Sequence, residues 1–530
     1  MMLVNQELLD RLDLERAAEL ELATSNRLMP RRPDRQALVH ATSEVARLMR
    51  NQYKTGNFGD PADVVFVDKN RRGRRPISEM TLRDRILFRA VVELIAESLP
   101  AHLVSRTPNT EFKRGPLDSP SAEYISKTDV VSYYEYVDHA RLADELESQT
   151  GEAPAIELLM ELLFRVMGRR VGLPQVHRSS DILGDTYIDP VRRRMRRAGY
   201  DVTSFSDDFR IASPTLADAR TALEACAREA RSLGLTLNES KTYTYRKENY
   251  RSSLDLFGEA ERRLFQESGE GAPDLNLLLI NDYEDEDDEV SETDEVASST
   301  LGGTAAQALL EDDVLHGVDA EGLLHVEDAQ RRAAERAWEI WLSEEDSEEQ
   351  PSRPDAATTE SLLSRALPIL GHAGVDAPVQ RLSRLLRSEP ALTPQVAAYI
   401  KALGMTSAAA RATLREGLDV LVTAPILSTW QKVWLAEACG GLRPVKGGAP
   451  HYEWLKQCVA SSEPALAATA AAALARLGRG DADEMLSAVD RVGLVWRPLV
   501  MWAVTQTDKA AAESLVDDRI DGILIESADW

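Results

Sequence analysis

Two adjacent carboxylates constrain the fold of this chain more than any other feature. Asp207 and Asp208 lie between two short segments rich in β-branched and aromatic residues, which favour β-strands. The pattern predicts a β-hairpin with the acidic pair at its tip. Because neighbouring side chains of a strand point to opposite faces, we expect only one of the two aspartates to face a shared metal site directly. The alternative interpretation is a solvated turn, in a chain with 88 acidic residues. The strand-favouring residues are Val202, Thr203 and Phe205 before the pair and Phe209 and Ile211 after it.

Charge is distributed unequally along the 530 residues. Residues 1–250 contain 38 basic and 38 acidic residues, whereas the rest of the chain holds 24 basic and 50 acidic ones, which is the entire net charge of −26. A neutral first half can bind nucleic acid through local basic patches. The acidic second half is expected to repel phosphate backbones.

The length predicts two to four domains, because a single hydrophobic core does not grow to this size. No run of eighteen apolar residues occurs, so we expect no membrane span. The first residues lack the basic start and apolar middle of a signal peptide. Only three cysteines occur, without metal-ligand spacing, and they are typical of buried thiols in a reducing cytoplasm. We therefore expect a cytoplasmic protein.

A strongly basic segment precedes a predicted helix in the first half. Five of the seven residues from Lys69 to Arg75 are basic, which suits a phosphate-binding loop or, alternatively, an exposed solvated loop. Thr81 is a suitable N-cap for a helix over residues 82–99, whose apolar positions recur at helical spacing.

Three further motifs follow in the first half. Asp129 ends a predicted strand, which is a rigid position for a metal ligand. The sequence Gly-Leu-Pro-Gln over residues 172–175 predicts a loop before a helix, and Gly-Leu-Thr-Leu-Asn-Glu-Ser-Lys-Thr over residues 234–242 predicts a strand closed by a turn.

In this order and spacing, these motifs resemble those of reverse transcriptases. The matched segment covers roughly residues 69–242, and Arg75-Pro76-Ile77 with Asp84-Arg85 resembles the fingers signature of the family. The resemblance implies a fingers and palm fold and an RNA-directed DNA-polymerase-like nucleotidyltransferase. It also implies two Mg²⁺ ions as cofactors, with Mn²⁺ as a substitute; oxygen ligands suit Mg²⁺.

The resemblance assigns a role to each matching residue. Asp129 and Asp207 match the carboxylates that hold the two metal ions, Asp208 matches a weaker participant, and the carbonyl of Val130 matches a backbone ligand. Lys241 matches a lysine that protonates pyrophosphate. Among nucleotide-binding residues, Lys69 and Arg75 match residues that hold the triphosphate, Tyr134 matches the aromatic that excludes a ribose 2′-OH, and Gln175 lines the nucleotide pocket. For Tyr134 the alternative is core packing, and for Lys241 it is a surface charge.

One departure from the family pattern affects the template. Gln175 is followed by Val176, where templated relatives usually have glycine, which lets the backbone approach the template closely. This departure puts ordinary template handling in question. No zinc-finger or nuclease motif is present in the sequence.

The second half predicts a helical region after an acidic segment. Residues 282–295 contain ten acidic residues and predict a solvated linker. From residue 360 onward, short amphipathic helices follow one another, which favours an all-α stack of helix pairs of HEAT type, with a compact bundle as the alternative. The predicted helices span 360–370, 377–387, 394–403, 407–422, 428–439, 452–462, 464–477, 481–490, 496–506 and 509–515.

These patterns together predict an α+β protein with three parts. Residues 1–280 form the reverse-transcriptase-like fingers and palm, residues 281–304 an acidic linker, and residues 305–530 the α-helical repeat region. This architecture resembles the bacterial abortive-infection and unknown-group reverse transcriptases of antiphage defence. Some of those proteins make DNA from dNTPs without a template, primed by a protein hydroxyl, and some form homo-oligomers.

We therefore expect a Mg²⁺-dependent, template-independent and protein-primed DNA polymerase, with dNTPs and a DNA product as partners. The alternatives are a templated reverse transcriptase acting on a bound non-coding RNA, and a catalytically inactive palm that serves as a scaffold or sensor. A priming tyrosine must lie on an exposed segment near Asp129 and Asp207. The candidates in polar surroundings are Tyr53, Tyr243, Tyr245, Tyr250 and Tyr283, with the 243–250 cluster favoured.

Overall fold

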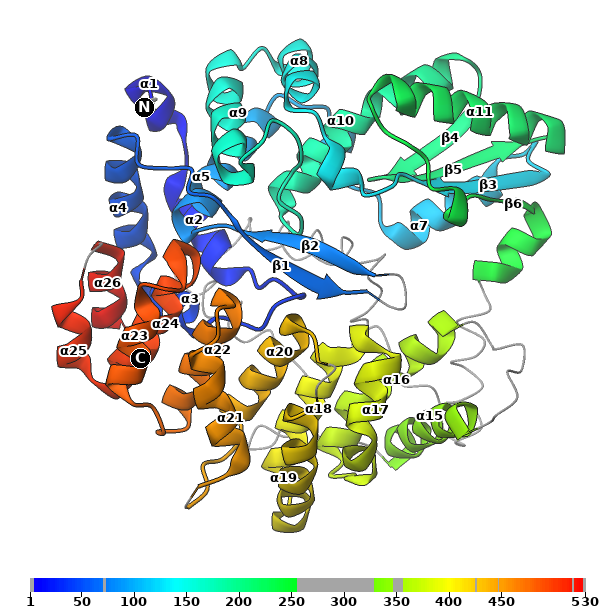
Figure 1. Ribbon diagram of the computed structural model, residues 1–530. Helices are drawn as coiled ribbons and strands as arrows, with labels where there is room; N and C mark the ends of the chain where they lie inside the picture. The colour runs from blue at the N-terminus through cyan, green and yellow to red at the C-terminus, as the bar shows by residue number, and fades with distance from the viewer. Residues whose placement is uncertain are drawn as a thin grey trace.

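The computed structural model describes most of the chain and shows an α+β organisation (Figure 1). The described residues are 4–69, 73–254, 328–346, 356–424, 427–446, 448–516 and 519–527. Within them, two small antiparallel sheets are surrounded by helices. The predicted linker at residues 281–304 lies outside the described residues, as does Tyr283, so the proposed domain boundaries stay a prediction.

The N-terminal part is a group of helices with one β-hairpin. Its elements are α1 (Gln6–Arg11), α2 (Leu14–Ala23), α3 (Pro33–Leu38), α4 (Thr42–Lys54), β1 (Asp63–Asp68), β2 (Arg74–Glu79) and α5 (Leu82–Ala96). Thr81 caps α5 as predicted, because its hydroxyl accepts a hydrogen bond from the Asp84 amide. β1 and β2 form a two-stranded sheet on their own, in the register Asp63↔Glu79 to Asp68↔Arg74.

The second sheet has four antiparallel strands in the order β4-β5-β3-β6. Its strands are β3 (Tyr124–Asp129), β4 (Asp201–Phe205), β5 (Asp208–Ser213) and β6 (Tyr243–Arg246). Helices α10 (Arg178–Arg197) and α11 (Leu216–Ser232) pack against its strands. The predicted hairpin is confirmed as β4–β5. The remaining helices of this part are α6 (Ala101–Val104), α7 (Asn109–Arg114), α8 (His139–Thr150) and α9 (Ala153–Met167), with short 3₁₀ turns η3 (Tyr133–Tyr136) and η4 (Glu239–Lys241).

The C-terminal part is all helical and forms an arc from α15 to α26 (Figure 1). The even-numbered helices α16 to α24 contact one another in succession, and the odd-numbered helices α17 to α23 form a second row. The α-helices of the whole C-terminal part are α15 (Asp328–Asp346), α16 (Ala356–His372), α17 (Leu382–Ser388), α18 (Thr393–Met405), α19 (Ala408–Val422), α20 (Thr429–Gly440), α21 (Pro450–Val459), α22 (Pro464–Arg476), α23 (Ala482–Val489), α24 (Gly493–Thr507), α25 (Lys509–Ser514) and α26 (Arg519–Ser527). The two rows agree with stacked helix pairs, and assignment to the HEAT type stays a prediction.

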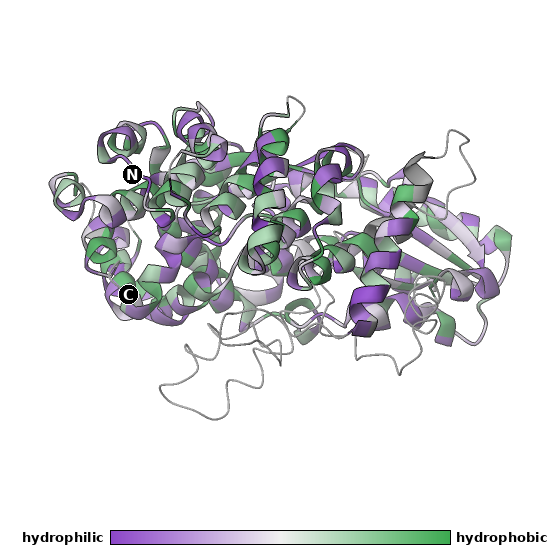
Figure 2. Cartoon of the chain, turned by 90° about the horizontal axis from the view of Figure 1, so that it is seen from below, coloured by the Kyte–Doolittle hydropathy of each residue, from purple (hydrophilic) through white to green (hydrophobic). Residues whose placement is uncertain are grey.

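Small side chains allow the closest packing within this arc. Residues 465–474 of α22 are all buried, and eight of those ten residues are alanine or threonine. A Cβ added to Gly440 of α20 would lie 2.7 Å from the Cα of Ala473 in α22. Such a distance is shorter than carbon atoms tolerate, so the two helices approach each other backbone to backbone. Along the ribbons of the arc, hydrophilic and hydrophobic residues are mixed within single helices, as amphipathic packing requires (Figure 2).

The N-terminal helices and the helical arc share one hydrophobic core. α24 and α26 pack on α3, and α20 packs on β1, so segments more than 350 residues apart in sequence are neighbours. The indole N–H of Trp430 donates to the carbonyl of Leu28 at 2.6 Å. Both termini lie at the same end of the molecule (Figures 1 and 2). The two sequence halves are therefore not separate bodies.

Candidate active site

The tip of the β4–β5 hairpin brings three aspartates together at one edge of the four-stranded sheet. Ser206 takes a left-handed backbone conformation with φ 50°, which turns the chain and places Asp207 in the turn. Asp208 starts β5 directly opposite Asp129 at the end of β3. The amide of Val130 donates to the carbonyl of Asp207 at 3.2 Å, which ties the turn to β3.

The three carboxylates interact electrostatically. Burial, together with the negative charges of Asp208 and Asp129, raises the pKa of the Asp207 carboxyl to about 7. Two cations offset part of this charge. Lys241 Nζ lies 3.1 Å from an Asp129 oxygen, and Arg210 Nη1 lies 3.3 Å from an Asp208 oxygen. The cluster therefore combines partly buried negative charge with a lysine at its border.

The expectation that only one aspartate of the pair faces the site rested on strand alternation. Asp207 lies in the turn, where alternation does not fix the direction of a side chain. Asp208 lies opposite Asp129, and directly opposed residues of an antiparallel pair project to the same face. The turn geometry thus allows all three carboxylates to influence one another.

Tyr134 lies beside the hairpin tip. Its hydroxyl donates to Asp181 Oδ1 at 2.8 Å and lies 3.3 Å from the hydroxyl oxygen of Ser206, the residue before Asp207. Tyr134 is half-buried, and its ring is 5.4 Å from that of Tyr133. The ring therefore forms part of the wall next to the carboxylates.

Gln175 and Val176 form the loop before α10. The Gln175 side-chain amide donates to Glu135 at 3.3 Å, and the Leu173 amide donates to the carbonyl of Tyr134 at 2.8 Å. These bonds hold the loop against η3, which carries Tyr134. Val176 has φ 63°, a left-handed conformation that β-branched residues rarely adopt. The backbone at this position therefore has the geometry of a glycine although a valine occupies it.

Lys69 and Arg75 lie at the end of the other sheet. Lys69 follows β1, and its amide donates to the carbonyl of Gly73 at 2.9 Å; Arg75 is the second residue of β2. The β1–β2 hairpin is separate from the sheet that carries the aspartates (Figure 1). The structure thus groups Asp129, Asp207, Asp208, Lys241 and Tyr134 directly and places Lys69 and Arg75 on a second element.

Residues 67–258 match the family model described as reverse transcriptase (RNA-dependent DNA polymerase). The chain therefore contains a segment that is similar to a reverse-transcriptase domain. The similarity indicates nucleotidyl transfer of the RNA-directed DNA-polymerase type. A search of curated proteins found no match. None of the helices in the described ranges has the length and hydrophobicity needed to cross a lipid bilayer.

The residues of the reverse-transcriptase domain suit a divalent metal ion. Within the described part of the chain, no group of three or more His, Cys, Asp or Glu side chains has the geometry of a preformed metal site. The donors at the hairpin tip are nevertheless hard oxygens, as Mg²⁺ prefers. Burial and the charges of Asp208 and Asp129 raise the pKa of Asp207. A bound cation would relieve this repulsion between the carboxylates.

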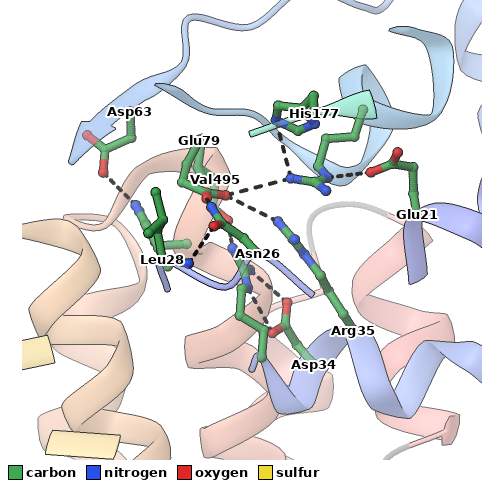
Figure 3. Close-up of polar contacts among 12 residues, drawn as sticks. Glu21, Asn26, Leu28, Asp34, Arg35, Asp63, Glu79, His177 and Val495 are labelled. Carbon is green, nitrogen blue, oxygen red and sulfur yellow. Dashed lines mark hydrogen bonds and ion pairs between the residues drawn. The ribbon is translucent and has the colours of Figure 1, made fainter. Parts of the chain in front are cut away.

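A buried ionic network surrounds Arg85 and reaches His177, the residue after Val176 (Figure 3). Arg85 is 2% exposed; its Nε donates to Glu21 at 2.7 Å, and its Nη1 lies 3.5 Å from His177 Nε2. Burial, aided by the Arg85 charge, lowers the pKa of His177 to about 3, so the ring is neutral. Arg35 lies 3.5 Å from Glu79 of β2. Asp84 accepts hydrogen bonds from the amides of Gly59 and Asp60. Asp84 and Arg85, which carry part of the resemblance to the fingers signature, therefore bond to other parts of the protein in this structure.

Sequence reasoning predicted the helix after the Gln175 loop but missed two aspartates on it that lie near the hairpin tip. Asp181 and Asp185 lie one turn apart on α10, and Arg106 Nε donates to Asp185 at 2.6 Å. Phe205 is the last residue of β4, and the Arg106 guanidinium lies 5.2 Å from the centre of its ring. The i, i+4 spacing of the two aspartates on a helix after the Gln175 loop was the available signal.

The tyrosines proposed as primers differ in their exposure to solvent. Tyr53 and Tyr250 were expected in polar surroundings, but both are buried, and their hydroxyls donate to the carbonyls of Arg83 and Lys113. Burial raises the pKa of Tyr53 well above its ordinary value. Tyr243 on β6 is 51% exposed and pairs with Lys127, two residues before Asp129. The ring of Tyr245 lies 6.1 Å from that of Tyr243 and 6.1 Å from that of Tyr250, tilted against both.

Proposed function

We propose that this chain is a Mg²⁺-dependent DNA polymerase that joins dNTPs at the tip of the β4–β5 hairpin. The observation that carries the proposal is the convergence of Asp129, Asp207 and Asp208 at one sheet edge, within the segment that matches reverse transcriptases. Nucleotidyl transfer needs carboxylates held rigidly, and two of these three are anchored in strands.

The residues around the tip can each perform one task. Asp129, Asp207 and the carbonyl of Val130 would hold two Mg²⁺ ions, which when bound lower the pKa of the attacking hydroxyl and neutralise the departing pyrophosphate. Lys241, 3.1 Å from Asp129, can donate a proton to that pyrophosphate. Asp208 is held by Arg210 and helps orient the turn.

Two groups would select and hold the incoming nucleotide. Tyr134, fixed by its hydrogen bond to Asp181, would block the 2′-hydroxyl of a ribonucleotide. Gln175 would line the same pocket from the loop bonded to η3. Lys69 and Arg75, at the end of the β1–β2 hairpin, would neutralise the triphosphate, and the guanidinium of Arg75 offers bidentate geometry.

The Val176 loop supports synthesis without a template. Templated relatives usually have glycine here, and Val176 has φ 63°, a conformation that suits glycine; a β-branched side chain therefore stands where a glycine would let the backbone approach a template closely. Priming by a protein hydroxyl fits Tyr243, which is exposed and lies on the strand next to Asp129. Antiphage defence, homo-oligomer formation and HEAT-type repeats are further parts of the proposal, supported by the resemblance in architecture.

The direct test is incorporation of labelled dNTPs by nuclease-treated protein. Asp129→Asn and Asp207→Asn are each expected to reduce incorporation by roughly a thousandfold or more, because both carboxylates are needed to hold the ions. Glu224→Gln, on the exposed surface of α11, is the matched control and should retain wild-type activity. Wild-type activity in either aspartate variant would exclude this site.

A second assay distinguishes template-free from templated synthesis. Wild-type protein is expected to extend without added nucleic acid and to yield a nucleotide-bearing peptide that contains Tyr243. Val176→Gly is expected to gain extension of a primed RNA template, because it removes the side chain from the loop. A defined RNA recovered with the purified protein, and strict dependence on it, would instead support the templated alternative.

A further inference from the structure

The β1–β2 hairpin is too small to be stable alone. A two-stranded sheet in water is marginally stable, and it needs a third strand or a packed helix for support. Val65 and Val67 on β1 are buried, whereas Val64 and Phe66 on the opposite face are exposed. The helix that packs on β1 is α20, which belongs to the C-terminal arc.

The last residue of β1 is joined to the first turn of α20. Asp68 is 7% exposed; one of its oxygens accepts from Arg74 Nε at 2.9 Å, and the other accepts from the Ser428 hydroxyl. Ser428 is also the N-cap of α20. Its hydroxyl oxygen accepts from the Gln431 amide at 3.1 Å, and its own amide donates to the Gln431 side chain at 3.0 Å. This capping box fixes the direction of the hydroxyl hydrogen toward Asp68.

The first residue of β1 is joined to another helix of the arc. The indole N–H of Trp496 in α24 donates to Asp63 Oδ2 at 2.5 Å, and Trp496 is 2% exposed. Figure 3 shows this bond at Asp63, next to the ionic network that holds Glu79 at the end of β2. Both ends of β1 are therefore held by side chains that lie more than 350 residues further along the chain.

We infer that the helical arc positions Lys69 and Arg75, at the end of the β1–β2 hairpin, for the nucleotide. It does so through Ser428 at one end of β1 and Trp496 at the other. The inference rests on the proposed function only where it concerns the nucleotide. Lys69 follows Asp68 directly, Arg75 follows Arg74, and the Lys69–Gly73 bond closes the loop between them. A change at Ser428 therefore acts on Lys69 through Asp68 and on Arg75 through Arg74. Ser428 and Trp496 are positioning residues and touch no substrate.

The test compares two helix caps. Ser428→Ala removes the cap of α20 and the bond to Asp68, whereas Ser407→Ala removes the cap of α19, where the hydroxyl accepts from the Ala410 amide at 3.1 Å. The two variants lose the same kind of cap, but only the first loses a contact with β1. Ser428→Thr keeps the hydroxyl and serves as rescue.

Hydrogen–deuterium exchange gives a measure that is independent of activity. In Ser428→Ala the amides of β1 and β2 are expected to exchange at least tenfold faster, because a hydrogen bond to a buried charge is lost, while those of β4 and β5 stay unchanged. In Ser407→Ala and Ser428→Thr the β1–β2 amides should exchange as in the wild type. Unchanged exchange in Ser428→Ala, or the same increase in Ser407→Ala, would overturn the inference.

Steady-state kinetics give the second measure. Ser428→Ala is expected to raise KM for dNTP roughly tenfold, because Lys69 and Arg75 would bind the triphosphate. Little change in kcat is expected, because the aspartates at the β4–β5 tip are unaltered. A fall in kcat at unchanged KM would overturn the link to the nucleotide. A wild-type protein without incorporation would refute the proposed function, while the exchange comparison would still decide whether the arc holds the hairpin.

The opposite end of β1 provides an independent variant should Ser428→Ala fold poorly. Trp496→Phe keeps an aromatic ring and removes the N–H to Asp63; Trp502→Phe on the same helix is the control for the loss of indole volume. Faster exchange of β1 and β2 is expected in Trp496→Phe alone. Equal exchange in the two tryptophan variants would contradict the role of the arc.

Discussion

The β4–β5 and β1–β2 hairpins differ in what supports them. β5 has a strand on each side, and α10 and α11 pack against the same sheet, so the aspartates are supported by residues within the segment that matches reverse transcriptases. β1 has one strand neighbour, and the contacts that hold its two ends come from α20 and α24. The comparison shows that the sheet edge with the three aspartates is held by neighbouring strands and helices, whereas the contacts at both ends of β1 come from the far end of the chain.

Removal of the helical arc should produce the largest difference between the hairpins. A chain ending at residue 346 exposes Leu28, Leu38 and the buried face of β1, and is expected to aggregate or to lose exchange protection throughout β1 and β2. Residues 356–530 co-expressed as a second chain should copurify with it and restore protection. A soluble, monomeric 1–346 fragment with protected β1 and β2 would show that the hairpin needs no arc.

The ionic network makes the β1–β2 side sensitive to acid. The folded pKa of His177 is lowered to about 3 by burial and by Arg85, so the unfolded chain binds a proton more readily below pH 6.5. The free energy of unfolding should therefore fall as the pH drops from 6.5, by about 2 kcal/mol at pH 5. Burial opposes the ionised form of Glu79, but the positive charge around it, chiefly that of Arg35, outweighs burial and lowers the pKa of this carboxyl. Protonation of Glu79 therefore reduces the free energy of unfolding further below pH 4.5.

His177→Gln is expected to reduce that loss of stability between pH 6.5 and pH 5. Denaturant unfolding at both pH values measures it, with His40→Gln at an exposed position as the control. Exchange at pH 5 should rise in β2 before it rises in β5. An identical pH dependence in wild type and His177→Gln would show that the network does not carry the effect.

Tyr134 tests the palm side without a substitution in either hairpin. Tyr134→Val should increase the ratio of rNTP to dNTP incorporation about tenfold, the size of a steric contact of about 1.4 kcal/mol. Tyr133→Phe is the control, because it removes a hydroxyl that donates to the Gly184 carbonyl and keeps the adjacent ring. An unchanged ratio would mean that Tyr134 only packs against the core.

Local features of the fold could be predicted from the sequence, because their signals lie in neighbouring residues. The turn at Asp207, the Thr81 cap and the helices from 356 to 515 follow from strand propensity, capping and helical periodicity. Helix α26 at Arg519–Ser527 was not predicted. The alanine-rich sequence of α22 likewise indicates close packing of that helix, and the Gly440–Ala473 approach agrees.

Contacts between distant segments could not be predicted. Ser428 and Asp68 are 360 residues apart, and a serine before a helix indicates only a cap. Trp496 in an apolar helix indicates only a core residue, although its N–H holds Asp63. The burial of Tyr53 and Tyr250 likewise depends on helices that surround them in space. Such contacts leave no periodic signal in the sequence.

The most direct test of the central claim, that the β4–β5 tip holds the catalytic metal ions, is Mn²⁺ binding followed by electron paramagnetic resonance. Residues 282–295 with their ten acidic residues supply a weak background, so the difference between variants is the measurement. Wild type and Glu224→Gln should share a tight site, and Asp207→Asn should weaken it at least tenfold. Equal Mn²⁺ affinity in wild type and Asp207→Asn would contradict the account.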